Sequence, residues 1–268
     1  MNEYNIVLFD MDGTLTPSRQ SIDQDMIDTL LTLSKKVKIG IVTGSGFDYV
    51  QEQCNSLLSN NSINKKNLAI LPCNGTQRYY FGESTKAWRK VYSNNMKKQI
   101  GDDNFKKIVK TIFKLQQQLM DKYNELPLSG TFIQYRGSML NWCPMGRDYN
   151  HEDRKAFIDI DKKSNLRKTL IKNLKKIFNK KNDNITFVLG GECSIDIYPK
   201  GWDKRYCLKQ YLHYENVFFV GDRCKKGGND YHLFKELDKK HTAFETKNPK
   251  DTIRIINDII IPRLESNV

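Results

Sequence analysis

The stretch Ile6-Val7-Leu8-Phe9-Asp10-Met11-Asp12-Gly13-Thr14 decides the fold of this chain, because it places two carboxylates directly after an apolar run. The apolar run predicts a buried strand, and Gly13 allows a tight turn behind it. In parallel α/β sheets the ligand crevice lies outside the carboxyl ends of the strands. Two acids at i and i+2 can serve there as a nucleophile and as a proton donor and acceptor. The pattern is typical of phosphoryl transfer.

Further apolar runs continue this pattern, and polar residues follow them. Residues 37–42 predict a strand that ends in Thr43-Gly44-Ser45, and residues 68–71 predict another. The run at 217–220 leads into Gly221-Asp222, so a carboxylate again follows a strand. Because helical stretches separate the first strands, we expect a parallel, right-handed sheet.

The middle of the chain has a different pattern. Apolar residues recur at helical spacing over 103–122 and 166–178, and we expect these helices to serve packing. Around them lie two predicted strand pairs, 131–135 with 138–142 and 185–189 with 194–198. We therefore predict an α/β protein with a parallel, doubly wound, Rossmann-like core at 1–83 and 201–268. An inserted α+β module with an antiparallel sheet occupies 84–200.

Length and composition narrow the class of protein. The 268 residues are 38% hydrophobic, which suffices for a full core in one large or two modest domains. The sequence has no charged-then-apolar leader and no stretch of the ~18 apolar residues that span a membrane. We therefore expect a cytoplasmic protein without a membrane partner. The cysteines and histidines lie too far apart in the sequence to predict a zinc site or a disulfide framework.

The formal net charge of +13 favours anionic partners and keeps nucleic acid as an alternative. Much of the charge lies in Lys- and Asn-rich stretches such as 175–182, which are typical of a solvated helix face. The sequence lacks the basic pattern with interspersed aromatic residues that marks RNA-binding sheets. We therefore expect no nucleic-acid partner.

Four motifs follow one another along the chain. They are Asp10-Met11-Asp12-Gly13-Thr14, Thr43-Gly44-Ser45, Lys204, and Gly221-Asp222 with Gly227-Gly228-Asn229-Asp230. Singly they could be turns, helix caps or surface charges, but in this order they resemble the motifs of the haloacid dehalogenase superfamily. Phosphoryl transfer needs a nucleophile, hard oxygen ligands for Mg²⁺, and cations near the phosphoryl oxygens. Asp10 and Asp222 suit the metal, and Lys204 supplies positive charge.

Within that superfamily the chain resembles the eukaryotic-type phosphomannomutase family over essentially its whole length. Four stretches carry the resemblance: Leu15-Thr16-Pro17-Ser18-Arg19-Gln20, Gly130-Thr131-Phe132-Ile133, Pro144-Met145-Gly146-Arg147 and Gly201-Trp202-Asp203-Lys204-Arg205-Tyr206-Cys207-Leu208. The resemblance implies that the inserted module is a cap, which often forms a homodimer contact. It also implies interconversion of mannose 6-phosphate and mannose 1-phosphate for GDP-mannose synthesis. Hexose 1,6-bisphosphate would be intermediate and activator.

The resemblance assigns roles to the catalytic and metal-binding positions. Asp10 would be the nucleophile, and Asp12 the acid/base that also offers its backbone carbonyl to Mg²⁺. Asp222 would complete the metal site, and Lys204 would act in catalysis. A second cation would lie near Phe234 and Glu236.

The resemblance also assigns the residues that would hold the sugar phosphate: Arg19, Arg136, Arg147, Arg154, Ser194 and Asp196. Strand alternation supports part of this set, because Ser194 and Asp196 share one face of their strand. Either Thr43 or Ser45 would bind the transferring phosphate, because Thr43-Gly44-Ser45-Gly46 departs from the family's Gly-Gly-Ser-Asp form.

Two alternatives stay open at this stage. A sugar-phosphate phosphatase of the same superfamily would pass the phosphoryl group to water and release only inorganic phosphate. A basic nucleic-acid-binding protein would show steeply salt-dependent affinity and would not need Asp10. The intact acids Asp10, Asp12 and Asp222 favour the mutase.

Overall fold

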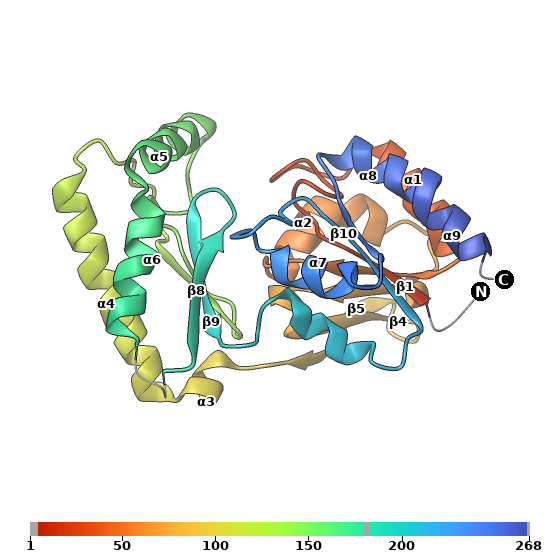
Figure 1. The fold of residues 1–268 in the computed structure, drawn as a ribbon, viewed down its shortest axis with the longest axis horizontal. Helices are drawn as coiled ribbons and strands as arrows, with labels where there is room; N and C mark the ends of the chain where they lie inside the picture. Colours follow the sequence, from red (N-terminus) through yellow and green to blue (C-terminus); the bar gives the residue numbers. More distant parts are fainter. Residues whose placement is uncertain (1–4, 180–182, 267–268) are drawn as a thin grey trace. The chain divides into compact units, whose positions relative to one another are not determined.

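The computed structural model describes residues 5–179 and 183–266, and it divides the chain into two compact units (Figure 1). The first unit consists of Met1–Ser93 and Trp202–Val268, and the second of Asn94–Gly201. The second unit thus begins at Asn94 and not at residue 84. The reason is that β5 (Ala87–Ser93) pairs with β4 (Gln77–Gly82) and extends the sheet of the first unit.

The first unit contains a seven-stranded sheet with the order β11-β10-β1-β2-β3-β4-β5. The predicted parallel core is confirmed in the strands β1 (Asn5–Phe9), β2 (Lys38–Val42), β3 (Leu68–Leu71) and β10 (Asn216–Gly221). β11 (Ala243–Glu245) pairs in parallel with β10 and had not been predicted. β4 and β5 are antiparallel and had not been predicted. The register of β1 pairs Phe9 with Val220 of β10, so the residues that follow these two strands emerge at one edge.

Helices cover both faces of this sheet, as a doubly wound fold requires. The helical segments of the first unit are α1 (Gln24–Ser34), α2 (Phe47–Leu58), η1 (Lys65–Asn67), η2 (Cys73–Gly75), η3 (Lys204–Gln210), α7 (Tyr231–Asp238), α8 (Pro249–Ile255), η4 (Ile256–Ile260) and α9 (Ile261–Ser266). Residues of α1, α2 and α8 pack on one face, and residues of η3 and α7 on the other. The Asp23 side chain caps α1 by accepting a hydrogen bond from the Met26 N–H at 2.8 Å.

The C-terminal helical segment contains a proline. The chain stays helical through Pro262, which lies in α9 directly after η4. A proline lacks an N–H and its ring collides with the carbonyl four residues earlier. The π-helical turn η4 lies directly before it, with the Ile261 N–H donating to the Ile256 carbonyl. This wider turn accommodates the proline ring without ending the helix.

The second unit contains one four-stranded antiparallel sheet, because β7 and β9 join the two predicted strand pairs. Its elements are α3 (Met96–Ile100), α4 (Asp102–Lys122), β6 (Ile133–Tyr135), β7 (Leu140–Trp142), α5 (His151–Ser164), α6 (Leu166–Ile177), β8 (Ile185–Gly190) and β9 (Ser194–Pro199). α4 and α6 lie on one side of this sheet (Figure 1). On that side the buried Trp142 indole donates to Gln116 of α4 at 2.8 Å. Because α4 and α6 cover only one side, the opposite face of this sheet can carry polar residues.

Candidate active site

Three acidic side chains meet at the carboxyl edge of the core sheet. Asp10 follows β1, Asp222 follows β10, and Asp230 directly precedes α7. One carboxylate oxygen of each lies within 4.8 Å of the others. Asp10 and Asp230 are buried and Asp222 is partly buried. The meeting follows from the register of β1 and β10, which brings Asp10 and Asp222 to the same edge.

The composition of this carboxylate cluster differs from the sequence expectation. The sequence assigned Asp10, Asp12 and Asp222 to the metal, with Asp12 contributing its backbone carbonyl. The Asp12 carboxylate lies outside the cluster and accepts a hydrogen bond from the Arg19 N–H at 2.9 Å. The third carboxylate of the cluster is that of Asp230. Asp230 was not assigned to the metal from the sequence, because Gly227-Gly228-Asn229-Asp230 has the composition of a turn. Its place in the fourth motif was the only sequence signal for a role in the site. The role expected for the Asp12 backbone carbonyl stays a prediction.

Lys204 is buried at the start of η3 and belongs to the same cluster. Its ammonium group donates to the carboxylates of Asp10 and Asp230. Burial raises the pKa of Asp10 well above its usual value and the charge of Asp230 raises it further, whereas Lys204 acts in the opposite direction. Burial would lower the pKa of Lys204, but the two carboxylates outweigh burial and raise it. Lys204 therefore stays protonated and orients the Asp10 carboxylate.

The cluster fits a divalent cation. Two of its three carboxylates, those of Asp10 and Asp230, pair with the ammonium of Lys204. Hard oxygen ligands are what Mg²⁺ and Ca²⁺ prefer. Burial, and then the charge of Asp230, raises the pKa of Asp222. The buried oxygens Asp222 Oδ1 and Asn229 Oδ1 have no hydrogen-bond partner among the residues that the structure describes. Unpaired buried oxygens and crowded carboxylates are the features that a bound cation relieves.

Gly13 keeps the first motif close to this cluster. Its φ angle is +84°, and a Cβ at this position would lie 2.5 Å from Asp222 Oδ2. A larger residue would therefore force the Asp222 carboxylate to move.

The second motif lies at the same edge, because β2 is the parallel neighbour of β1. The buried Thr43 hydroxyl accepts a hydrogen bond from the Ser45 N–H at 3.0 Å. Both hydroxyls thus remain candidates for the transferring phosphate. Phe234 and Glu236 lie on α7, where the Glu236 carboxylate pairs with Lys239 at 3.0 Å. The second-cation site stays a prediction.

Several expected sugar-phosphate residues meet on the polar face of the second unit's sheet. The register pairs Asn141 with Asp196, and the Asn141 amide donates to Ser194 Oγ at 2.9 Å and to Asp196 Oδ1 at 2.6 Å. The guanidinium of Arg147 donates to Asn141 Oδ1. Asn141 is buried and was missed from the sequence, where an asparagine within a short strand gives no distinctive signal.

The other expected arginines have separate neighbours. Arg136 donates to Gln134 Oε1 at 3.0 Å, and Gln134 pairs in register with Asn141. Arg154 of α5 forms an ion pair with Glu192 in the turn between β8 and β9. Arg19 belongs to the first unit, where its guanidinium lies 5.1 Å from the centroid of the Tyr49 ring.

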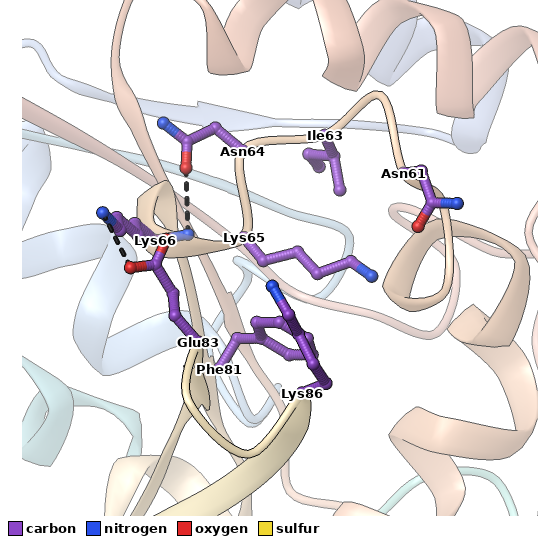
Figure 2. A pocket seen from close by; sticks show the side chains of 8 residues that line it. All are labelled: Asn61, Ile63, Asn64, Lys65, Lys66, Phe81, Glu83 and Lys86. Carbon is purple, nitrogen blue, oxygen red and sulfur yellow. Dashed lines mark hydrogen bonds and ion pairs between the residues drawn. The ribbon is translucent and has the colours of Figure 1, made fainter.

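A further cavity, of about 380 Å³, lies in the first unit beside η1 and the β4–β5 hairpin (Figure 2). Its lining residues are Asn61, Ile63, Asn64, Lys65, Lys66, Phe81, Glu83 and Lys86. Lys66 and Glu83 form an ion pair at 2.9 Å. Because none of the expected site residues lines this cavity, the carboxylate cluster remains the candidate active site.

The sequence model of eukaryotic phosphomannomutase matches residues 26–262 of this chain. The chain belongs to the eukaryotic phosphomannomutase family. A phosphomannomutase of Schizosaccharomyces pombe is 36% identical over 257 residues, which cover 95% of this chain and 93% of the relative. Phosphomannomutase 2 of Dictyostelium discoideum is 32% identical, with 98% and 99% covered. The family predicted from the sequence is thus confirmed, and the chain is an enzyme.

Among solved structures, that of a mutant IMP-nucleotidase of Plasmodium falciparum with bound IMP superimposes with a TM-score of 0.63 at 18% identity. The match covers 97% of this chain and 67% of that chain, and it shows the fold alone. The phosphomannomutase family implies a divalent metal, which the carboxylate cluster fits. Within residues 5–179 and 183–266, no helix combines the length and the apolar character that crossing a membrane requires.

Arg167 stabilises the sheet of the second unit from the side that α6 covers. It was not predicted as a site residue from the sequence. This buried α6 residue donates from its backbone N–H and Nε to the two Asp161 carboxylate oxygens, at 2.8 and 2.9 Å. Its Nη1 donates to the carbonyls of Gly191 and Ser194, both at 3.1 Å. One guanidinium thus fixes the β8–β9 turn and the start of β9. In a helix rich in Lys and Arg, nothing in the sequence separates it from surface charge.

Arg167→Met is therefore expected to destabilise the protein by roughly 3 kcal/mol, because it removes the cation from the partly buried Asp161 carboxylate and the Nη1 donor from two carbonyls. Denaturant unfolding followed by circular dichroism measures the loss. Arg167→Lys keeps the charge but not the planar fork, so an intermediate loss is expected. If both variants unfold at the wild-type denaturant concentration, the contacts of Arg167 do not fix this turn.

Metal affinity is expected to depend on pH. The pKa values of Asp10 and Asp222 are raised, so lowering the pH protonates them earlier than ordinary carboxylates. Because a cation binds only the ionised form, Mg²⁺ affinity should fall as the pH is lowered, and the fall should begin at a higher pH than for ordinary carboxylates, with protons released on binding. Isothermal titration in two buffers of different ionisation enthalpy measures both quantities.

A pair of matched variants assigns this metal affinity to the carboxylate cluster. Asp230→Asn should weaken Mg²⁺ binding strongly, whereas Asp238→Asn, which changes an exposed acid at the end of α7, should not. Equal losses in the two variants would contradict the assignment, as would an affinity that does not change with pH.

Proposed function

We propose that this chain interconverts mannose 6-phosphate and mannose 1-phosphate through a phosphorylated Asp10 and a hexose 1,6-bisphosphate. The supporting observation is the cluster of Asp10, Asp222, Asp230 and Lys204 at the carboxyl edge of the core sheet. The chain's membership in the phosphomannomutase family supports the substrate. Mannose 1-phosphate would supply GDP-mannose synthesis.

Asp10 acts as the nucleophile in this proposal. Its carboxylate oxygen bonds to phosphorus as the phosphorus–oxygen bond to the sugar breaks, and Asp12 gives a proton to the departing sugar oxygen. In the opposite direction, Asp12 removes the proton from a sugar hydroxyl that takes the phosphoryl group from Asp10. Lys204 holds the Asp10 carboxylate in position. Bound Mg²⁺, held by Asp10, Asp222 and Asp230, would neutralise charge on the transferring phosphoryl group.

The second unit supplies the groups that hold the rest of the substrate. In each half-reaction one end of the sugar phosphate reacts, and the other end must be held. Arg147, supported by Asn141, suits this task because a guanidinium binds phosphate through two parallel hydrogen bonds. Arg136 and Arg154 add positive charge, and Ser194 and Asp196 would bind sugar hydroxyls. As a cap, the unit would also keep water from phosphorylated Asp10.

Phosphorus NMR tests this function directly. The enzyme is given mannose 1-phosphate, Mg²⁺ and a catalytic amount of hexose 1,6-bisphosphate. The proposal predicts conversion into mannose 6-phosphate with little inorganic phosphate, and faster conversion with the bisphosphate than without it. Release of inorganic phosphate alone would show a sugar-phosphate phosphatase instead.

The family resemblance supports further parts of the proposal. The enzyme would act in the cytoplasm, without nucleic acid, as a homodimer formed through the second unit. Sedimentation velocity checks the oligomeric state, and a monomer at micromolar concentration would remove that part alone.

A further inference from the structure

One buried amide on the polar face of the second unit's sheet connects groups with two different expected roles. Asn141 of β7 is 2% exposed, and its Oδ1 accepts a hydrogen bond from the Arg147 guanidinium. Its Nδ2 donates to Asp196 Oδ1 at 2.6 Å and to Ser194 Oγ at 2.9 Å. The Ser194 hydroxyl in turn donates to the Gly190 carbonyl at 2.6 Å. Asn141 thus contacts an arginine expected to bind phosphate and both residues expected to bind sugar hydroxyls.

The contacts at its two ends fix which way this amide points. A guanidinium only donates hydrogen bonds, and an ionised carboxylate only accepts them. The reversed amide would set its N–H groups against Arg147 and its oxygen against Asp196. The side chain at position 141 must therefore accept a hydrogen bond at one end and donate at the other. Among side chains of this size, neither an ionised aspartate nor a leucine does both.

The neighbouring strand repeats this use of an amide. Gln134 of β6 pairs in register with Asn141, and its Oε1 accepts a hydrogen bond from Arg136 Nε at 3.0 Å. Arg167, on the side of the sheet that α6 covers, is held instead by the Asp161 carboxylate. A carbonyl oxygen orients a guanidinium without adding a negative charge, whereas a carboxylate adds one. The two amides thus orient two arginines and add no negative charge to the face that would receive a phosphate.

We propose that Asn141 is a positioning residue, which couples the phosphate-binding Arg147 to the hydroxyl-binding pair Ser194 and Asp196. This inference rests on the proposed function, which assigns to these three residues what they bind. Because Asn141 is buried, it acts on a substrate through its neighbours: its oxygen orients the guanidinium, and its nitrogen orients the hydroxyl and the carboxylate. One amide thereby fixes the group that holds the phosphate relative to the groups that hold the sugar.

Steady-state kinetics of Asn141→Asp and Asn141→Leu with mannose 1-phosphate test this role. The first change keeps the shape of the side chain but adds a negative charge beside Arg147 and Asp196, and the second removes both hydrogen-bonding ends. Each should raise KM about tenfold or more, which is the factor that a hydrogen bond to a charged group contributes. The value of kcat should change less, because both changes leave Asp10 and its carboxylate cluster in place.

Asn104→Asp is the matched control for these variants. It makes the same chemical change in α4, on the side of the sheet away from the polar face, where the Asn104 amide donates to the Ile100 carbonyl at 2.9 Å. Its KM should equal that of the wild type. Thermal unfolding separates positioning from folding, because a merely structural Asn141 would lower the Tm when replaced and leave KM unchanged. That result, or an equal rise of KM in Asn104→Asp, would overturn the proposal.

A double variant shows whether Asn141 acts through Arg147. In an Arg147→Met enzyme, Asn141→Asp should raise KM by a smaller factor than in the wild type, because the guanidinium that Asn141 orients is absent. Equal factors in the two backgrounds would contradict the coupling. Arg147→Met alone separates this inference from the proposed function. If it leaves KM unchanged, the polar face does not hold the substrate as proposed; if it raises KM and Asn141→Asp does not, only the positioning role of Asn141 fails.

Discussion

Replacing Asp10 by asparagine is expected to lower kcat at least about 10⁴-fold, because the amide cannot act as the nucleophile. Folding should survive this change. The buried Asp10 carboxylate has a raised pKa, so its ionised form costs free energy, and Lys204 keeps its ion pair with Asp230. The variant should therefore unfold at the wild-type Tm or above it. A coupled assay of mannose 6-phosphate formation and thermal unfolding measure the two effects.

Asp12→Asn is the matched control for this prediction. Its loss should be smaller, about 10²–10⁴-fold, because it removes proton transfer and leaves the nucleophile in place. This variant should still accept a phosphoryl group from hexose 1,6-bisphosphate, whereas Asp10→Asn should not. An Asp10→Asn enzyme with activity within about tenfold of wild type would exclude Asp10 as the nucleophile.

Lys204→Met is expected to destabilise the protein by about 3–5 kcal/mol, because it removes the cation from between two buried carboxylates. Activity should also fall, because Asp10 loses the group that orients it. Mg²⁺ should recover part of the lost stability by supplying positive charge at the same cluster. Denaturant unfolding with and without Mg²⁺ measures both effects.

The double variant Lys204→Met/Asp230→Asn separates charge from packing. Removing the negative charge of Asp230 should restore part of the stability that Lys204→Met loses. If the losses of the single variants simply add, the two side chains do not interact energetically. That result would contradict the role assigned to Lys204.

The core sheet and the position of Asp10 were predictable from sequence, because their signals are local. An apolar run followed by two acids and a glycine identifies the end of β1, and the run before Asp222 identifies the end of β10. β4 and β5 were missed because most of their residues are partly or fully exposed, which leaves no alternation between apolar and polar residues. Their pairing with the parallel sheet is a tertiary contact.

The contents of the site were harder to predict, because they depend on contacts between distant parts of the chain. Asp230 joins Asp10 and Asp222 only when α7 packs beside β10, and its own sequence is that of a turn. Asn141 and Arg167 act through side chains and carbonyls brought together by the second unit's sheet. Arg147, Ser194 and Asp196 were predicted as site residues from family motifs and strand alternation, because composition alone does not separate them from other polar residues.

The chemical position of the transferred phosphoryl group tests the account most directly. The enzyme is mixed with hexose 1,6-bisphosphate and Mg²⁺, quenched in acid within one turnover, and treated with borohydride, which reduces an acyl phosphate to an alcohol. Mass spectrometry of the peptides that contain Asp10, Asp12 and Asp222 then locates the reduced residue. Reduction is expected at Asp10 alone, and none in Asp10→Asn. Reduction at Asp12 or Asp222, or an unmodified peptide from an enzyme that turns over, would contradict it.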